Sequence, residues 1–182
     1  MEQKTDLTFS QPGAREALLL WWNELDNVRG VRAALRQCHN PLEVAFTPEF
    51  HQLKMKLEPF GSISPDQMNR LAIVAGVLSH VKPDSHEKNL QRSFAVQMAS
   101  PPLKGSTRKK ACVSDIRFQQ LLKIEDPGKL YTTMIRLVRL VGGSVDIVSL
   151  ANGIYWWNER TKKEWAYAYY ENAPGEEKQG VS

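Results

Sequence analysis

With 182 residues, 42% of them hydrophobic and five of them Trp, the chain has enough apolar material for a packed core in one domain or in two small ones. This composition excludes a chain that is disordered throughout. The formal net charge of +4 is too small to indicate a partner by itself, so that question depends on how the charge is distributed along the chain.

The first predicted helix follows the Pro-Gly pair at residues 12–13. Its apolar residues recur at steps of three and four positions and so share one face. They are Leu18, Trp21, Trp22 and Leu25. We expect the two tryptophans to lie in the core. A second, short helix after Gly30 has a basic stripe on a side separate from its apolar one, and the stripe consists of Arg29, Arg32 and Arg36.

Two further helices begin with recognisable caps. Thr47 followed by Pro48 predicts a helix to about Leu57, because Thr accepts a backbone hydrogen bond at the cap and Pro suits the first turn. Ser64, with Gln67 at the third helical position, forms the pattern of a capping box. The apolar run LAIVAGVLSHV that follows could be a buried strand if it stood alone. Its cap and its length of about four turns predict a buried helix instead.

Two polar stretches interrupt the helical pattern. Residues 82–90 are polar, and residues 100–113 (SPPLKGSTRKKACV) combine two Pro, a Gly and four basic residues. The pattern leaves open whether residues 90–99 form a helix. We expect the basic, Pro- and Gly-containing stretch 101–113 to be a linker or a functional loop at a domain boundary.

The second half of the chain is again predicted to be helical. Ser114 can cap a helix whose charged and apolar residues lie on separate sides. A longer helix is expected from Asp126 to the glycine pair at 142–143, since glycine suits a helix end. In this longer helix Lys129 and Arg136 lie nearly opposite the apolar arc.

The last elements complete an all-α prediction. Asp146 can cap a further helix that includes Trp157, and the run WAYAYY can add a final turn or two. We expect two small helical bundles, one in residues 1–100 and one in residues 114–172, joined by the basic linker at 101–113. The polar end, residues 173–182, is expected to be disordered.

Basic residues are concentrated in one part of the chain. The window 104–139 has nine basic and three acidic residues, a net charge of +6, which leaves −2 for the rest. This excess favours a polyanionic partner, because basic side chains that neutralise phosphates release counterions; an ordinary solvated face is the alternative. The candidate nucleic-acid-binding residues are Lys104, Arg108, Lys109, Lys110, Arg117, Lys123, Lys129, Arg136 and Arg139, with Arg32 and Arg36 as a second patch.

The sequence lacks the usual signals of catalysis and metal binding. Its four histidines are scattered, and no HExxH, CxxC, phosphate-cradling or serine-nucleophile motif occurs. We therefore expect no enzyme activity, no cofactor and no metal. Cys38 and Cys112 are far apart, which fits reduced thiols in the cytoplasm. No run approaches the roughly 18 apolar residues of a membrane span, and the N-terminus has no apolar signal region, so no membrane partner is expected.

Two strings of the sequence carry a resemblance to a known family. Residues 21–53, WWNELDNVRGVRAALRQCHNPLEVAFTPEFHQL, combine an aromatic helix, a Gly turn, a basic helix and a Pro-containing helix. Residues 113–157 contain an S-x-x-R-F-x-x-L-L segment, an Arg-bearing helix and a closing D-x-x-x-L-A-x-x-x-x-W-W helix. In the order and spacing of these features the chain resembles the CasB family, the small subunit of type I-E CRISPR surveillance complexes (Cascade).

The resemblance implies a helical protein of two bundles without catalytic activity. It implies two copies head to tail in a complex with CRISPR RNA, in contact with the backbone and large subunits. The implied role is to hold the target and displaced DNA strands so that the R-loop persists. The basic positions that match the family's motifs are Arg32 and Arg36 in the first string and Arg117, Lys123 and Arg136 in the second.

The chain departs from the family pattern in residues 101–111 and after Tyr170, so the loop residues among the candidates rest on charge alone. Two other functions stay open. A free-standing helix-turn-helix regulator would use the helix at 29–36 for recognition and would show a sequence preference. A metal-dependent nuclease without familiar motifs would show Mg²⁺-dependent cleavage that is lost when one carboxylate is changed.

Overall fold

The structure, a computed structural model, describes residues 6–82, 92–102 and 109–175. Within these ranges the chain forms ten α-helices and one short 3-10 helix, and its extended pairing is limited to a single parallel bridge between Asp6 and Ser62. The predicted all-α class is confirmed. In chain order the elements are α1 (Pro12–Glu24), α2 (Val31–Gln37), α3 (Pro41–Ala45), α4 (Pro48–Leu57), η1 (Glu58–Phe60), α5 (Pro65–Leu78), α6 (Phe94–Ala99), α7 (Asp115–Leu122), α8 (Pro127–Leu140), α9 (Ile147–Tyr155) and α10 (Glu159–Asn172).

Most of the predicted helix starts are confirmed at the level of their hydrogen bonds. The Ser64 hydroxyl accepts a hydrogen bond from the backbone N–H of Gln67, and the side-chain oxygen of Gln67 accepts one from the backbone N–H of Ser64. These two bonds complete the capping box of α5. The side chains of Asp126 and Asp146 cap α8 and α9 by accepting a backbone N–H three residues further on. Ser114 occupies the cap position of α7, but its side chain makes no cap hydrogen bond.

Four helical segments either add to the sequence expectation or differ from it. The undecided stretch 90–99 contains α6, capped by Ser93, and the short helix α3 was not expected at all. The run WAYAYY belongs to a full 14-residue helix, α10, whose start is capped by Asn158. Trp157 is buried, but it lies in the turn between α9 and α10, since α9 ends at Tyr155.

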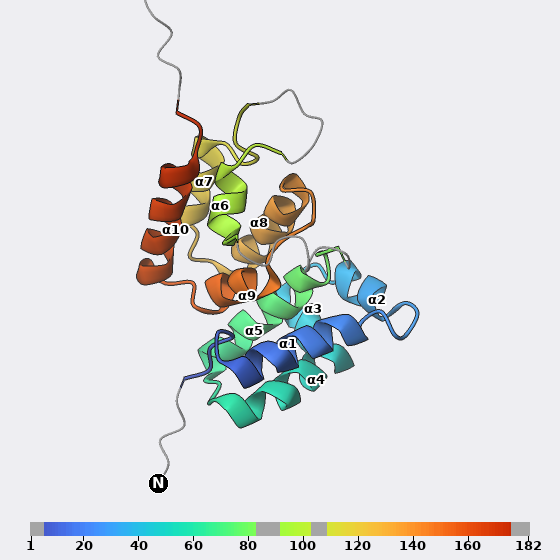
Figure 1. The fold of residues 1–182 in the computed structure, drawn as a ribbon. Helices are drawn as coiled ribbons and strands as arrows, with labels where there is room; N and C mark the ends of the chain where they lie inside the picture. Colours follow the sequence, from blue (N-terminus) through green and yellow to red (C-terminus); the bar gives the residue numbers. More distant parts are fainter. Residues whose placement is uncertain (1–5, 83–91, 103–108, 176–182) are drawn as a thin grey trace, which may run out of the picture.

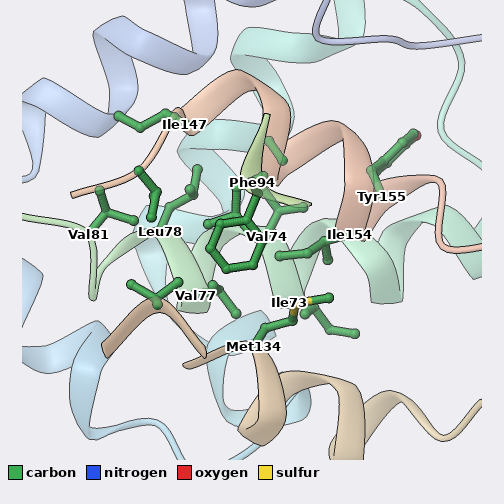
Figure 2. Close-up of a cluster of buried hydrophobic side chains, with 14 of the residues drawn as sticks. Ile73, Val74, Val77, Leu78, Val81, Phe94, Met134, Ile147, Ile154 and Tyr155 are labelled. Atoms are coloured by element: carbon green, nitrogen blue, oxygen red, sulfur yellow. The ribbon is translucent and has the colours of Figure 1, made fainter. Parts of the chain in front are cut away.

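Helix α5 lies at the centre of the molecule. Its last eight residues, from Leu71 to Leu78, are all buried, which explains why this segment is apolar on every side. Figure 1 shows α1 and α4 on one side of α5 and α8 and α9 on the other. Figure 2 shows Ile73, Val74 and Val77 of α5 among side chains of α6, α8 and α9.

The buried residues form one hydrophobic cluster that runs through both halves of the chain. Phe94 of α6, which belongs to the predicted N-terminal part, packs edge-on against Trp165 of α10 with ring centroids 5.6 Å apart. The two predicted bundles therefore share a single core. The boundaries at 1–100, 101–113 and 114–172 stay a prediction, and residues 103–108 of the predicted linker lie outside the described part. Residues 176–182 of the predicted disordered tail also lie outside it.

Candidate nucleic-acid interface

Arg32 is buried inside the fold, with an exposed fraction of 6%. Its guanidinium group binds both carboxylate oxygens of Asp26, at 2.7 and 2.8 Å, and donates to the backbone carbonyl of Trp22 at 2.9 Å. It also lies 4.8 Å from the centre of the Trp22 ring. Arg32 therefore has a structural role at the end of α1, where helix carbonyls lack partners, and its donors are used within the protein.

Arg36, one turn further along α2, lies at the surface. Its Nε donates to the carbonyl of Ser79 at 2.7 Å, so it also satisfies a carbonyl at the C-terminal end of α5. The pKa of Arg36 is lowered, first by partial burial and then by the neighbouring charges of Arg32 and Arg139, against the opposing effect of Asp26. Among the described residues, none forms a hydrogen bond or ion pair with the two terminal nitrogens of Arg36.

Helix α8 presents a basic stripe to solvent. Lys129, Arg136 and Arg139 are exposed, while the opposite face of the helix is buried. The spacing of seven and three residues places the three within an arc of about 80° on one side of the helix. Within the described residues none of the three forms an ion pair with an acidic side chain, so the charge of this stripe is not neutralised by that part of the protein.

The remaining candidates lie on other elements. Arg117 and Lys123 are exposed at the start and end of α7, a helix whose Phe118 stacks on Tyr169 of α10. Lys109 and Lys110 are exposed just before α7. Among the described residues no hydrogen bond or ion pair joins these four residues to the α8 stripe. Lys104 and Arg108 lie outside the described segments.

The structure brings together Arg36 of α2, Arg139 of α8 and His80 from the turn after α5. An N–H of Arg139 approaches Nδ1 of His80 at 3.5 Å. Burial, followed by the charges of Arg139 and Arg36, lowers the pKa of His80 to about 4. His80 is therefore neutral at pH 7. We call these three residues the α2–α8 basic cluster.

Sequence reasoning missed His80 because the four histidines are scattered along the chain. Residues 36, 80 and 139 meet only after α2 and α8 have packed near the end of α5. No spacing in the sequence signals this meeting, since the cluster depends on contacts between residues more than forty positions apart.

Three general features of the described residues bear on function. They contain no group of three or more His, Cys, Asp or Glu side chains able to hold a metal ion. None of the described helices is long and apolar enough to cross a membrane. Cys38 and Cys112 are both free thiols.

Comparison with known proteins gives a consistent set of matches. The family model described as CRISPR-associated protein Cse2 matches residues 31–170. The crystal structure of CasB from Thermus thermophilus is 24% identical with a TM-score of 0.57, and the match covers 88% of this chain and 98% of that chain. A further crystal structure of a Cse2-family CRISPR-associated protein from Thermus thermophilus is 24% identical with a TM-score of 0.55 and the same coverage.

A chain in the crystal structure of E. coli Cascade bound to a PAM-containing double-stranded DNA target is 20% identical with a TM-score of 0.53. This match covers 86% of the present chain and 94% of the chain in that complex. No curated protein sequence matches the chain. At these identities the structural matches establish the fold, and the family model covers well over half of the sequence.

Proposed function

Because the chain belongs to the Cse2 family of CRISPR-associated proteins, we propose that it is a non-catalytic small subunit of a type I-E RNA-guided complex and that its basic surface holds DNA backbone in the R-loop. The proposed partners are the backbone and large subunits of that complex, its CRISPR RNA, both DNA strands and a second copy of this chain head to tail. The match to a chain of a DNA-bound Cascade supports membership of such an assembly.

The observation that carries the DNA contact is the unneutralised stripe on α8. From Lys129 to Arg139 it extends about 15 Å, at a rise of about 1.5 Å per residue. One DNA strand carries a phosphate for about each 3.4 Å of helix axis, so the stripe matches about four phosphates. Contacts of this kind position a strand without reading its bases.

Such contacts suit the energetics of an R-loop. The RNA–DNA heteroduplex is about as stable as the DNA duplex that it replaces, so strand exchange is nearly balanced. Protein cations that bind the displaced or target strand shift that balance toward the open state. This role needs rigid, exposed charges and no reacting group.

The alternative of a helix-turn-helix regulator is not favoured by the site. A recognition helix presents its side chains to the major groove. The helix that would take this role, α2, has only seven residues, and Arg32 and Leu35 are buried against the rest of the protein.

Membership of the complex is tested by co-purification. A tagged chain co-expressed with the neighbouring genes is expected to recover CRISPR RNA together with the other subunits. Recovery of the tagged chain without RNA and without any other subunit would overturn the proposal.

The DNA contact is tested on the assembled complex with Arg136→Gln. Because one phosphate contact is lost, we expect weaker retention of all target sequences alike and a salt dependence reduced by about one counterion. The matched control is Arg15→Gln, since Arg15 is exposed on α1 and its side chain forms no ion pair with a described residue. Equal retention by the two variants at physiological salt would refute the role of the α8 stripe.

A further inference from the structure

A groove of about 780 Å³ lies between the segment before α1, helix α9 and helix α10. Gly153 of α9 and Trp165 of α10 both line it, and a Cβ atom at Gly153 would collide with the Trp165 ring, so the two helices are in close contact there. Ligand sites in proteins commonly have volumes of about 300–1,000 Å³. The groove is open to solvent, because five of its lining residues are exposed: Asp6, Ser10, Asn158, Arg160 and Glu164.

Hydrogen bonds between distant parts of the chain hold the walls of the groove. The side-chain oxygen of Asn152 on α9 accepts from the backbone N–H of Phe9 at 2.9 Å, and its Nδ2 donates to the Ser10 hydroxyl at 2.9 Å. The indole N–H of Trp156 donates to the carbonyl of Leu7 at 3.2 Å. Walls that are already fixed lose little freedom when a ligand binds, which favours affinity.

The polar side chains of the groove combine hydrogen-bond donors with acceptors. They include two hydroxyl groups and two side-chain amides, which belong to Ser10, Ser149, Asn152 and Asn158. Each of these groups can both donate and accept. An extended polypeptide needs both, because its N–H and C=O groups alternate along the chain. A phosphate group offers oxygen acceptors alone, so this set suits a polypeptide better than a nucleic-acid backbone.

The charge of the groove is opposite in sign to that of the α8 stripe. Two carboxylates, from Asp6 and Glu164, and one guanidinium group, from Arg160, line it, which gives a net charge of −1. Arg160 is bound to Glu164 at 3.0 Å, whereas Asp6 forms no ion pair with a described residue. These charges repel phosphate and attract a cation.

The groove and the basic stripe also lie on different elements. In Figure 1 α10 lies at the left of the molecule, whereas α8 and α2 lie to its right. Along α10 the lining residues extend from Arg160 to Ala168, about 12 Å at a rise of about 1.5 Å per residue. An extended chain covers that distance with about four residues, at about 3.3 Å each. A short peptide segment therefore fits the groove while the stripe binds DNA.

We propose that this groove binds an extended segment of a different protein subunit of the complex, with a Lys or Arg side chain of that segment beside Asp6 and Glu164. The presence of other subunits rests on the function proposed above. The class of ligand rests on the donors, acceptors and charges of the groove itself. The chain thus has one surface for DNA and a separate one for protein.

The occupant is tested by photo-cross-linking in the assembled complex. A benzophenone side chain replaces Ala168, which lines the groove, and in the control it replaces Lys163, which is exposed on the same helix outside the groove. We expect position 168, and not position 163, to join a Lys- or Arg-containing peptide of a different subunit. Cross-links that lead only to nucleic acid, to a second copy of this chain or to the chain itself would overturn the proposal. Yields at position 168 no higher than at position 163 would also overturn it.

The charge of the groove is tested by Glu164→Lys against Glu159→Lys. Both residues are exposed on α10, but Glu159 does not line the groove, so the control makes the same change outside it. Because like charges across an interface are costly, we expect recovery of Glu164→Lys in the purified complex to fall roughly tenfold. Glu159→Lys is expected to stay within about twofold of the parent chain. Equal recovery of the two variants, with unchanged thermal unfolding, would refute the acidic contact.

The same measurements separate this groove from the proposed function. If Arg136→Gln weakens DNA retention and Glu164→Lys is recovered like the parent chain, the DNA-holding function stands and the protein groove is refuted. If Glu164→Lys is lost from the complex and Arg136→Gln retains DNA normally, the groove stands and the DNA contact of the α8 stripe is refuted. If isolated Glu164→Lys binds a single-stranded oligonucleotide roughly tenfold more tightly or more weakly than Glu159→Lys, the groove contacts nucleic acid and its assignment to protein is refuted.

Discussion

Arg32 and Arg36 are one helical turn apart on α2 and have opposite surroundings. Arg32 reaches inward to Asp26 and Trp22, while Arg36 is exposed and binds one carbonyl through its Nε. Both side chains satisfy carbonyls at the C-terminal ends of neighbouring helices, where the helix dipole favours a cation. The first role of Arg32 and Arg36 is therefore to join α2 to the C-terminal ends of α1 and α5.

Replacing Arg32 is expected to destabilise the protein. Arg32→Met leaves Asp26 and the Trp22 carbonyl without partners, and we expect a loss of about 2–3 kcal/mol in the free energy of unfolding. Arg36→Met, the control on the same helix, is expected to cost about 1 kcal/mol or less. Urea unfolding followed by circular dichroism measures both. Similar losses for the two variants would contradict the structural assignment of Arg32.

His80 gives a prediction for acid stability. Its pKa is lowered to about 4 in the folded chain from an ordinary value of 6.5, so below pH 6.5 the unfolded chain binds a proton that the folded chain does not. The contribution of His80 is thus complete above pH 6.5 and is lost between pH 6.5 and about 4. Allowing for solvent screening, we expect a loss of about 2 kcal/mol.

This loss is measured as a difference between two proteins. We compare urea unfolding of the parent chain with that of His80→Gln, whose side chain does not titrate. Each protein is measured at about pH 7.5 and at about pH 4.5, which together span most of the window. The other titratable groups change the free energy of unfolding of both proteins equally, so their effects cancel in the comparison. A difference that does not change between the two pH values would show that His80 titrates normally.

Among the elements, α5 and α7 begin with the same kind of residue but not with the same contacts. Ser64 of α5 takes part in a full capping box, whereas the side chain of Ser114 makes no cap hydrogen bond. Ser64→Ala is expected to cost about 1 kcal/mol of unfolding free energy, and Ser114→Ala only a few tenths. Thermal unfolding of the two variants tests this order, and a larger loss from Ser114→Ala would reverse it.

The α8 helix joins the core to the candidate interface. One face carries Met134 and Val138 into the buried cluster, and the other carries the basic stripe. Because the buried face fixes the rotation of the helix, the orientation of the three cations follows from the packing of its apolar residues. The sequence pattern predicted this division, and the burial of the residues confirms it.

At the scale of the molecule, the shared core predicts cooperative unfolding. Met134 of α8 lies in the cluster with Ile73 and Phe94 (Figure 2). Met134→Ala leaves a cavity in this core and is expected to cost about 2–5 kcal/mol. We expect the whole transition to move to lower denaturant without splitting, with circular dichroism and tryptophan fluorescence still coincident. Two separate transitions would indicate that the two halves fold independently.

Local chemistry in the sequence was enough to predict the all-α class and the caps at Thr47, Ser64, Asp126 and Asp146. It also predicted that α8 ends shortly before Gly142 and Gly143. The two glycines adopt positive φ values of 92° and 79°, a conformation that other residues rarely take. These features depend on residues within one or two turns of each other. The sequence also identified which face of α8 is charged, because that division repeats with the helical period.

Tertiary structure decided which of the predicted cations are available to a partner. Arg32 and Arg36 have the same local pattern, and only the packing of α2 against the ends of α1 and α5 buries one and exposes the other. The meeting of Arg36, His80 and Arg139 has the same origin, since it joins segments far apart in the chain. Helical periodicity determines the face on which a side chain lies, whereas burial, hydrogen-bond partners and neighbouring charges depend on the other elements that pack beside it.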